Sequence, residues 1–120
     1  MEVDQYGLEV LRADDCRALL ATRTIGRIGT SIDALPVIVP MSYGLEDDFV
    51  VLQTRPDTAL DKALVDCVVC FEVDSIGEGG EYDWGVNVTG KAEAVLVSGE
   101  RWVRIPTAVI TGRRRNPPRG

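Results

Sequence analysis

Apolar and polar residues alternate along several stretches of the chain, as they do in strands that bury one face. The longest alternation spans residues 84–97, where Trp84, Val86 and Val88 share one face and polar side chains occupy the other. Short turn-forming segments such as "EDD" and "SGE" separate these runs. Six strands are therefore predicted, at residues 24–32, 34–45, 49–54, 67–76, 84–97 and 101–112.

Two short segments space their apolar residues as helices do. Residues 11–23 predict one helix, and residues 56–66 predict a second, with Asp57 or Thr58 as its cap and Leu60 and Leu64 on one face. Six strands and two short helices predict a mainly β fold, an antiparallel barrel with helices at its ends. We expect a single domain over residues 1–112 and a disordered basic tail over residues 113–120.

Composition narrows the classes of function. The chain has 120 residues and a net charge of −6, which argues against a nucleic-acid-binding protein. No apolar run is long enough to cross a membrane, and the N-terminus lacks the pattern of a signal peptide. Three cysteines imply no closed disulfide framework, so a reducing cytoplasm is predicted. The absence of histidine excludes imidazole bases, Ser-His triads and His-ligated metal sites.

Cys67 and Cys70 have the C-x-x-C spacing of zinc and redox sites, but they lie in a predicted strand. Side chains three positions apart in a strand point to opposite faces, so the two thiols cannot share a metal ion. Cys67 has the same parity as Val69 and Phe71. We therefore interpret both cysteines as structural, with Cys67 in the core, and predict no metal site.

The predicted strand at residues 34–45 contains a proline in its middle. Pro40 has no N–H to give to a sheet, so it belongs at an edge or a bulge. Its neighbours can then offer backbone groups to a ligand. An ordinary edge strand without a ligand is the alternative, and the pattern alone favours it.

The start of the second predicted helix carries residues that suit an anion. Thr54, Arg55 and Thr58 flank the helix start, and Lys62 lies one turn beyond Thr58. This arrangement predicts either a phosphate site or a capped helix whose charged residues lie in water. In the basic segment after residue 112, Arg113 lies nearest the last strand and is kept as a candidate site residue.

The ordered set of motifs resembles the pyridoxamine 5'-phosphate oxidase-like family of flavin-binding split barrels, in particular its small actinobacterial members. The resembling pieces cover roughly residues 10–114 and follow the family's order. They are "LLATRTIGRIGT", "LPVIVPMSYGLEDDFVVLQT", "DTALDKA", "VVCFEVDSI", "WGVNVTGKAEAV" and "VRIPTAVITGRR".

The resemblance implies a six-stranded antiparallel split barrel that forms a homodimer and holds FMN in a groove at the dimer interface. Some members of the family hold a deazaflavin coenzyme or haem-related ligands instead. By the same resemblance, the strand "VPMSY" runs along the flavin ring, which makes Val39, Pro40, Met41 and Ser42 candidate contacts. The segment "QTRPDTALDK" holds the phosphate through Thr54, Arg55, Thr58 and Lys62, and Trp84 lies near the flavin.

The sequence departs from the family pattern in three places. The family commonly has Gly-Thr-Lys-Leu at the phosphate, whereas this chain has "DTAL", with Asp57 in place of the glycine and Ala59 in place of the lysine. The segment "WGVNV" replaces the usual Trp-Ser-Val. A helix and loop that the family often has near "VSGE" are missing.

These features lead to three hypotheses about function. The first is an FMN-dependent oxidoreductase of unknown substrate, in which the flavin carries hydride and the protein orients it. The second is a non-catalytic protein that holds a flavin or a deazaflavin. The third is a split-barrel dimer that has lost its cofactor, which the changes at Asp57 and Ala59 favour.

Overall fold

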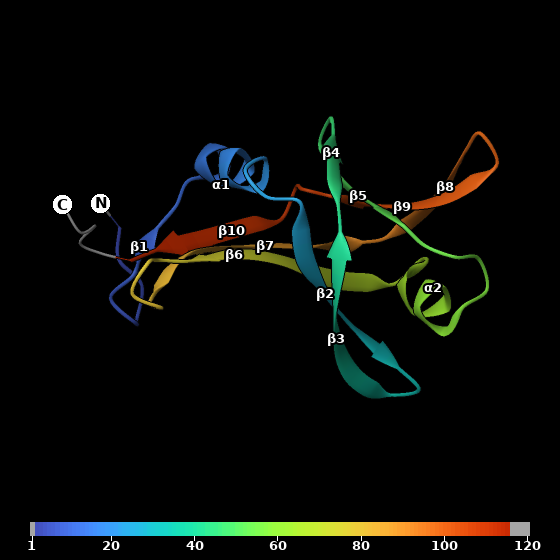
Figure 1. Cartoon of the computed structure of the whole chain (residues 1–120), viewed down its shortest axis with the longest axis horizontal. Helices are drawn as coiled ribbons and strands as arrows, with labels where there is room; N and C mark the ends of the chain where they lie inside the picture. The colour runs from blue at the N-terminus through green and yellow to red at the C-terminus, as the bar shows by residue number, and fades with distance from the viewer. Residues whose placement is uncertain (1, 116–120) are drawn as a thin grey trace.

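The computed structural model describes residues 2–115 and shows two antiparallel sheets with two short helices, α1 (Ala13–Leu20) and α2 (Ala59–Leu64) (Figure 1). In order across the sheet, the six-stranded sheet contains β1 (Glu9–Val10), β10 (Ile110–Arg114), β7 (Tyr82–Lys91), β6 (Val68–Ile76), β2 (Ile25–Ile32) and β3 (Leu35–Ser42). The four-stranded sheet contains β4 (Gly44–Glu46), β5 (Phe49–Gln53), β9 (Glu100–Pro106) and β8 (Glu93–Val97).

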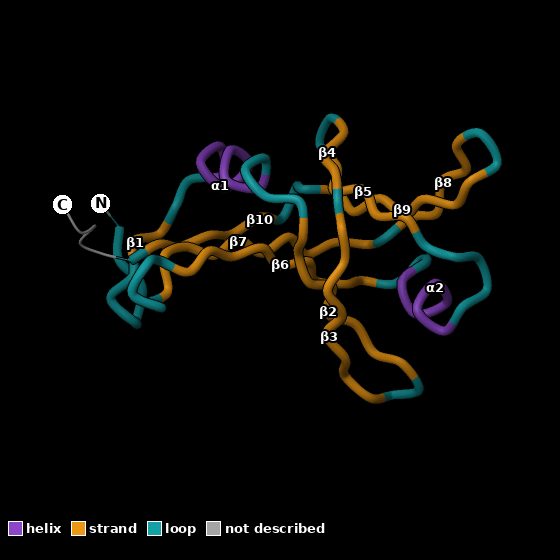
Figure 2. Tube along the Cα trace, in the orientation of Figure 1, coloured by secondary structure: helices purple, strands orange, loops and turns teal. Residues whose placement is uncertain are grey.

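The mainly β class is confirmed, but three of the predicted strands are each two strands that belong to different sheets (Figure 2). Residues 34–45 divide into β3 and β4 at Tyr43, residues 84–97 into β7 and β8 at Ala92, and residues 101–112 into β9 and β10. With β1 added, the described residues form ten strands rather than six. Alternation reports which face of a strand is buried but not which neighbour it pairs with, so it cannot locate these breaks.

The break at Ala92 has a specific cause. Ala92 is fully buried, and its N–H donates to the carbonyl of Cys67 at 2.9 Å while its carbonyl accepts from the N–H of Asp66 at 2.8 Å. The backbone groups of Ala92 are therefore bonded to the turn before β6. The chain leaves one sheet at this point and enters the other.

The core is made of aliphatic side chains together with Phe71, Trp84 and Cys16, and α1 packs against β10. Cys16 of α1 is fully buried and lies directly over Gly112, where a side chain would collide with its sulfur. The predicted place of Cys67 in the core is wrong. Cys67 is exposed because β6 begins only at Val68 and the residue belongs to the preceding turn.

Arg113 and Arg114 belong to β10, not to a disordered tail, so the predicted boundary at residue 112 is corrected. Arg114 donates to both carboxylate oxygens of Glu9 on β1, at 2.9 and 3.1 Å. Arg113 forms an ion pair with Asp4 at 3.3 Å. These pairs hold β10 against the N-terminal segment that contains Asp4 and β1. The predicted disorder of residues 116–120 lies outside the described residues.

The β2–β3 hairpin turns through two residues with left-handed backbone, Asp33 (φ 51°) and Ala34 (φ 64°). Alanine is strained there because its Cβ crowds the carbonyl oxygen. We expect Ala34→Gly to raise the free energy of unfolding by about 0.5–1 kcal/mol, the relief of strain minus the added freedom of the unfolded chain. Urea denaturation measures this change. Ala18→Gly in α1 is the matched control and should destabilise; if both variants destabilise, the turn is not strained.

Candidate functional site

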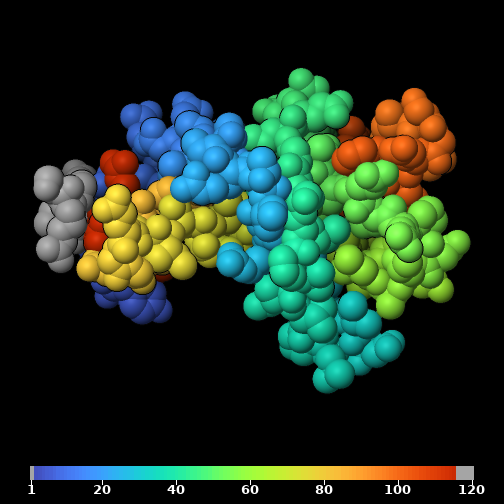
Figure 3. All heavy atoms as spheres, in the orientation of Figure 1, coloured from blue at the N-terminus to red at the C-terminus, as the bar shows by residue number. Residues whose placement is uncertain are grey.

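A groove lies between β3 and the four-stranded sheet, at the place where the strand predicted to contact a ligand ends. Its volume is about 690 Å³. In the space-filling view, the teal segment that contains β3 crosses the front of the molecule, with the segments of α2 and β8 to one side (Figure 3). The groove is lined by Val39, Pro40, Met41, Ser42, Tyr43, Gly44, Val51, Gln53, Leu60 and Trp102. All four residues predicted along the ligand ring are therefore in one place.

The strand β3 has a free edge toward the groove, because it is the last strand of its sheet. The N–H of Tyr43 donates to Thr24 on the β2 side, at 3.0 Å. N–H groups of successive residues in a strand point to alternate edges, so the N–H of Met41 also points to β2. The backbone of Pro40 and Ser42 faces the free edge. Pro40 thus costs the sheet no hydrogen bond, and Ser42 is the residue that can offer a backbone N–H to a ligand.

The walls of the groove are apolar and partly rigid. Tyr43 is held in place because its hydroxyl donates to the carbonyl of Leu20 and its ring meets Phe71 edge-on, with ring centroids 5.1 Å apart. Burial raises the pKa of Tyr43, so it remains a neutral phenol at physiological pH. Trp102 lies opposite Gln53 on β5 and is half-buried. Trp102 could not be predicted from sequence, because one aromatic residue in a predicted strand has no feature that separates a groove residue from a core residue.

The residues predicted to hold phosphate lie around the start of α2, but the two hydroxyls among them, those of Thr54 and Thr58, are already bonded within the chain. Thr58 caps α2 by accepting from the N–H of Asp61 at 3.2 Å, and its hydroxyl donates to the carbonyl of Arg55 at 2.9 Å. Thr54 is buried and donates to Asp61 at 2.8 Å. Lys62 lines a different hollow, of about 460 Å³, together with Ser31, Asp33 and Cys67 among others.

A buried carboxylate, that of Asp61, forms an ion pair with the half-buried Arg101, and the sequence did not predict this pair. The side chain of Asp61 is 5% exposed, and Arg101 Nη1 approaches its two oxygens at 3.2 and 3.1 Å. The carboxylate also accepts from the backbone N–H of Asp57 at 3.1 Å. Asp57 has left-handed backbone (φ 65°), which fits a position where the family commonly has glycine. An aspartate in a first helical turn is too common to indicate such a partner from sequence.

Trp84 and Arg113 lie far from this groove within one chain. Trp84 pairs with Arg114 at the end of β10. In Figure 1, this end of the six-stranded sheet and α2 lie toward opposite ends of the molecule. The Trp84 ring is 7% exposed and packs beneath the guanidinium of Arg23, 5.5 Å from the ring centroid. Arg113 contacts Asp4 and Tyr6. The structure thus separates the ten predicted site residues into the groove, the α2 region and this distant end.

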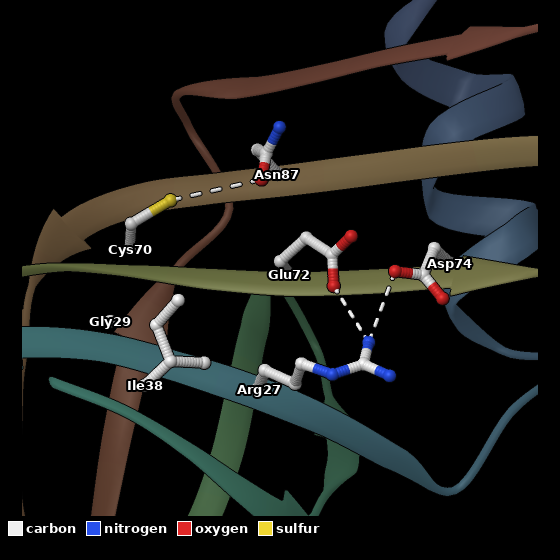
Figure 4. Close-up of a pocket in the computed structure, with 7 residues that line it drawn as sticks. All are labelled: Arg27, Gly29, Ile38, Cys70, Glu72, Asp74 and Asn87. Carbon is white, nitrogen blue, oxygen red and sulfur yellow. Dashed lines mark hydrogen bonds and ion pairs between the residues drawn. The ribbon is translucent and has the colours of Figure 1, made fainter.

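A third hollow, of about 470 Å³, lies on the outer face of the six-stranded sheet (Figure 4). Arg27 reaches between two carboxylates on β6 and donates through Nη1 to Glu72 at 3.2 Å and to Asp74 at 3.0 Å. On the other side, Cys70 points toward Asn87. Burial, and then hydrogen bonding and charge repulsion from Asp74, raise the pKa of Glu72 to about 7, although Arg27 opposes them.

This raised pKa predicts a pH dependence of stability. The folded chain keeps a proton on Glu72 up to about pH 7, whereas the unfolded chain loses it near 4.5. The free energy of unfolding should therefore fall as pH rises through this interval. In Glu72→Gln, we expect the decrease in the free energy of unfolding over this pH interval to be smaller by about 1 kcal/mol. This figure allows for solvent screening of the half-exposed side chain. Urea denaturation at pH 5 and pH 8 measures it.

The control for this experiment is Glu78→Gln, which changes an exposed glutamate in the turn after β6. Its pH profile should match that of the unmodified chain. If Glu72→Gln also leaves the profile unchanged, Glu72 does not hold the proton.

The described residues show neither a metal-binding cluster nor a membrane-spanning helix. No cluster of three or more His, Cys, Asp or Glu side chains that could hold a metal ion occurs within residues 2–115. Within the same part of the chain, no helix has the length and apolar character needed to cross a membrane.

The chain belongs to the pyridoxamine 5'-phosphate oxidase family, whose model matches residues 12–116. The FAD-binding protein from Mycobacterium smegmatis is 32% identical, with a TM-score of 0.78 over 91% of this chain and 99% of that chain. A FAD-binding protein from Mesorhizobium loti is 21% identical, with a TM-score of 0.74 over 88% of this chain and 95% of that chain.

A flavocytochrome from Azotobacter vinelandii shares the fold at 14% identity, with a TM-score of 0.79 over 98% of this chain and 74% of that chain. No curated protein matches the chain. The family predicted from the ordered motifs is confirmed, and so is the mainly β, split-barrel type of fold that the family implies.

Proposed function

We propose that the protein binds a flavin coenzyme in the β3 groove and acts as an oxidoreductase of its family. The observation that carries the proposal is the free edge of β3 facing an apolar groove, where Ser42 offers a backbone N–H. An isoalloxazine ring has flat apolar faces and one edge of hydrogen-bonding atoms. The groove therefore fits the ring portion of FMN, of FAD or of a deazaflavin coenzyme.

Family relatives support the choice of ligand. The M. smegmatis protein at 32% identity is described as FAD-binding, and a second, more distant neighbour has the same description. FMN is the coenzyme that the motif resemblance implies for this chain. Arg55 is exposed at the start of α2, where it would meet the phosphate end of a ligand in the groove.

The chain's own residues would bind and orient the coenzyme rather than exchange protons with a substrate. When bound, a flavin supplies hydride transfer. Tyr43 is the one side chain that titrates among the described groove residues, and its hydroxyl is bonded to Leu20. Trp102, Val51 and Leu60 would exclude water from the ring. A proton needed by the reaction would therefore come from the substrate or from solvent.

The proposal includes a homodimer in the cytoplasm. Trp84 and Arg113 lie away from the groove of their own chain, so they could contribute to a flavin site only from a second copy. Three free cysteines fit a reducing compartment.

Absorbance of the purified protein, followed by titration with FMN, FAD and a deazaflavin, tests the proposal. A bound flavin spectrum or saturable binding is expected, and reduction by NADH or NADPH with turnover of an acceptor would establish an oxidoreductase. Saturable binding without reduction by either nucleotide would favour a carrier.

A cofactor-free scaffold is the second candidate, because Asp61 already binds several donors near the groove. Absence of binding to all three ligands at high concentration would favour it and contradict the flavin proposal.

A further inference from the structure

Three pairs of consecutive residues connect the groove to the Asp61 cluster, which consists of Thr54, Asp57, Asp61 and Arg101. Gln53, Leu60 and Trp102 line the groove. The residues next to them in the chain are Thr54, Asp61 and Arg101. The Asp61 cluster therefore lies immediately behind these three lining residues, on the α2 side of the groove.

The cluster has the donors that proteins use for a phosphate. A guanidinium, a hydroxyl and a backbone N–H converge on one position, from β9, from the end of β5 and from the loop before α2. Charge-assisted hydrogen bonds of this kind are the ones that hold carboxylates and phosphates in proteins. Here all of them end on the carboxylate of Asp61, which is almost completely buried.

We infer that Asp61 is a specificity-determining residue that fills, from within the chain, the anion position next to the groove. This inference rests on the proposed flavin site and concerns its selectivity. The donors are already bonded to a carboxylate, and that carboxylate adds a negative charge where a phosphate would lie. The groove therefore recognises mainly the flavin ring. The phosphate gains only the exposed guanidinium of Arg55, whose contribution is small because water screens it. The lysine missing at Ala59 removes the cation that would have offset this charge.

Titration with riboflavin and FMN measures the contribution of the phosphate directly, because the two ligands differ only in that group. We expect the unmodified protein to bind them with affinities within about threefold of each other. In Asp61→Ala, and in the isosteric Asp61→Asn, the preference for FMN should rise by about tenfold or more, the effect of freeing one charged hydrogen-bond donor. A strong FMN preference in the unmodified protein that falls in these variants would overturn the inference.

A second measurement does not depend on flavin binding. Formate has the size of the carboxylate that Asp61→Ala removes, so it should enter the vacated position. We expect formate, compared with chloride at equal ionic strength, to raise the melting temperature of Asp61→Ala by about 4 °C at ten times its dissociation constant. The unmodified protein and the exposed-aspartate control Asp66→Ala should show no such shift.

The two measurements separate the possible failures. If formate does not stabilise Asp61→Ala selectively, the cluster is not an anion site and the inference is wrong. If formate does stabilise it but neither flavin binds the unmodified protein, the proposed function fails, while the assignment of an anion position filled by Asp61 is supported. Asp61→Asn preserves the shape of the side chain and provides the affinity ratio if Asp61→Ala does not fold.

Discussion

Replacing Phe71 with alanine should lower the free energy of unfolding by about 3–5 kcal/mol. Phe71 is the largest fully buried side chain, at the centre of β6. Its ring lies against the backbone of Gly26, where a side chain would collide with it, and meets Tyr43 edge-on. The surrounding strands are bonded on both sides of β6, so they cannot collapse into the cavity that the substitution leaves. Equilibrium denaturation in urea measures the loss.

Val68→Ala is the matched control for this experiment, since Val68 lies on the same strand but is 72% exposed. Its effect should stay within about 0.5 kcal/mol, as expected for an exposed position. Because Phe71 also supports Tyr43 in the groove, a folded Phe71→Leu variant should bind flavin more weakly than the unmodified protein. A loss below 1 kcal/mol in Phe71→Ala would show that the core around β6 repacks.

Replacing Trp102 with alanine should weaken flavin binding by about 10- to 100-fold, the range for losing one aromatic stacking surface. Trp102 is the largest side chain that lines the groove, and it stands opposite Gln53 with Val95 on its other side. The prediction follows from the proposed function, because an isoalloxazine ring in the groove would lie against this indole. Titration of the apoprotein, followed by flavin fluorescence, gives the two dissociation constants.

Two further variants make the result specific. Trp102→Phe keeps an aromatic surface and should recover most of the affinity. Leu96→Ala removes an exposed apolar side chain from the opposite face of the same sheet and should change nothing. If Leu96→Ala weakens binding as much as Trp102→Ala does, the ligand lies outside the groove.

The faces of the strands could be predicted from sequence because alternation is a local property. Val69, Phe71 and Val73 of β6 are buried, as are Trp84, Val86 and Val88 of β7. The ends of the strands could not be predicted where the chain changes sheets, as at Ala92, because the partners of Ala92 lie about 25 residues away in sequence. Cys67 was misplaced because β6 begins only at Val68. Cys67 lies in the preceding turn, where the alternation of a strand no longer decides which way a side chain points.

The residues of the candidate site also divide into those that local sequence predicts and those that only distant contacts bring into place. Pro40 indicated an edge or a bulge, because a residue without an N–H interrupts the hydrogen bonds of a central strand, and β3 is an edge strand. The motif order around Val39–Ser42 indicated which edge faces a ligand, and these residues do line a groove. Trp102 and Arg101 come from β9. Trp102 is 49 residues from Gln53 of β5, its partner, and Arg101 is 40 residues from Asp61 of α2. No local pattern connects either residue to its partner.

By itself, the sequence determined the mainly β class and the family. It also narrowed the place of Pro40 to an edge or a bulge and the cap of α2 to Asp57 or Thr58, since each of these depends on residues close together in the chain or on the order of motifs. Only the tertiary structure decided which strands share a sheet, that Trp102 completes the groove and that Asp61 occupies the donors behind it. These features depend on contacts between distant segments. Such contacts form when the sheets pack, because buried backbone and charged groups must then find partners wherever the fold brings them together.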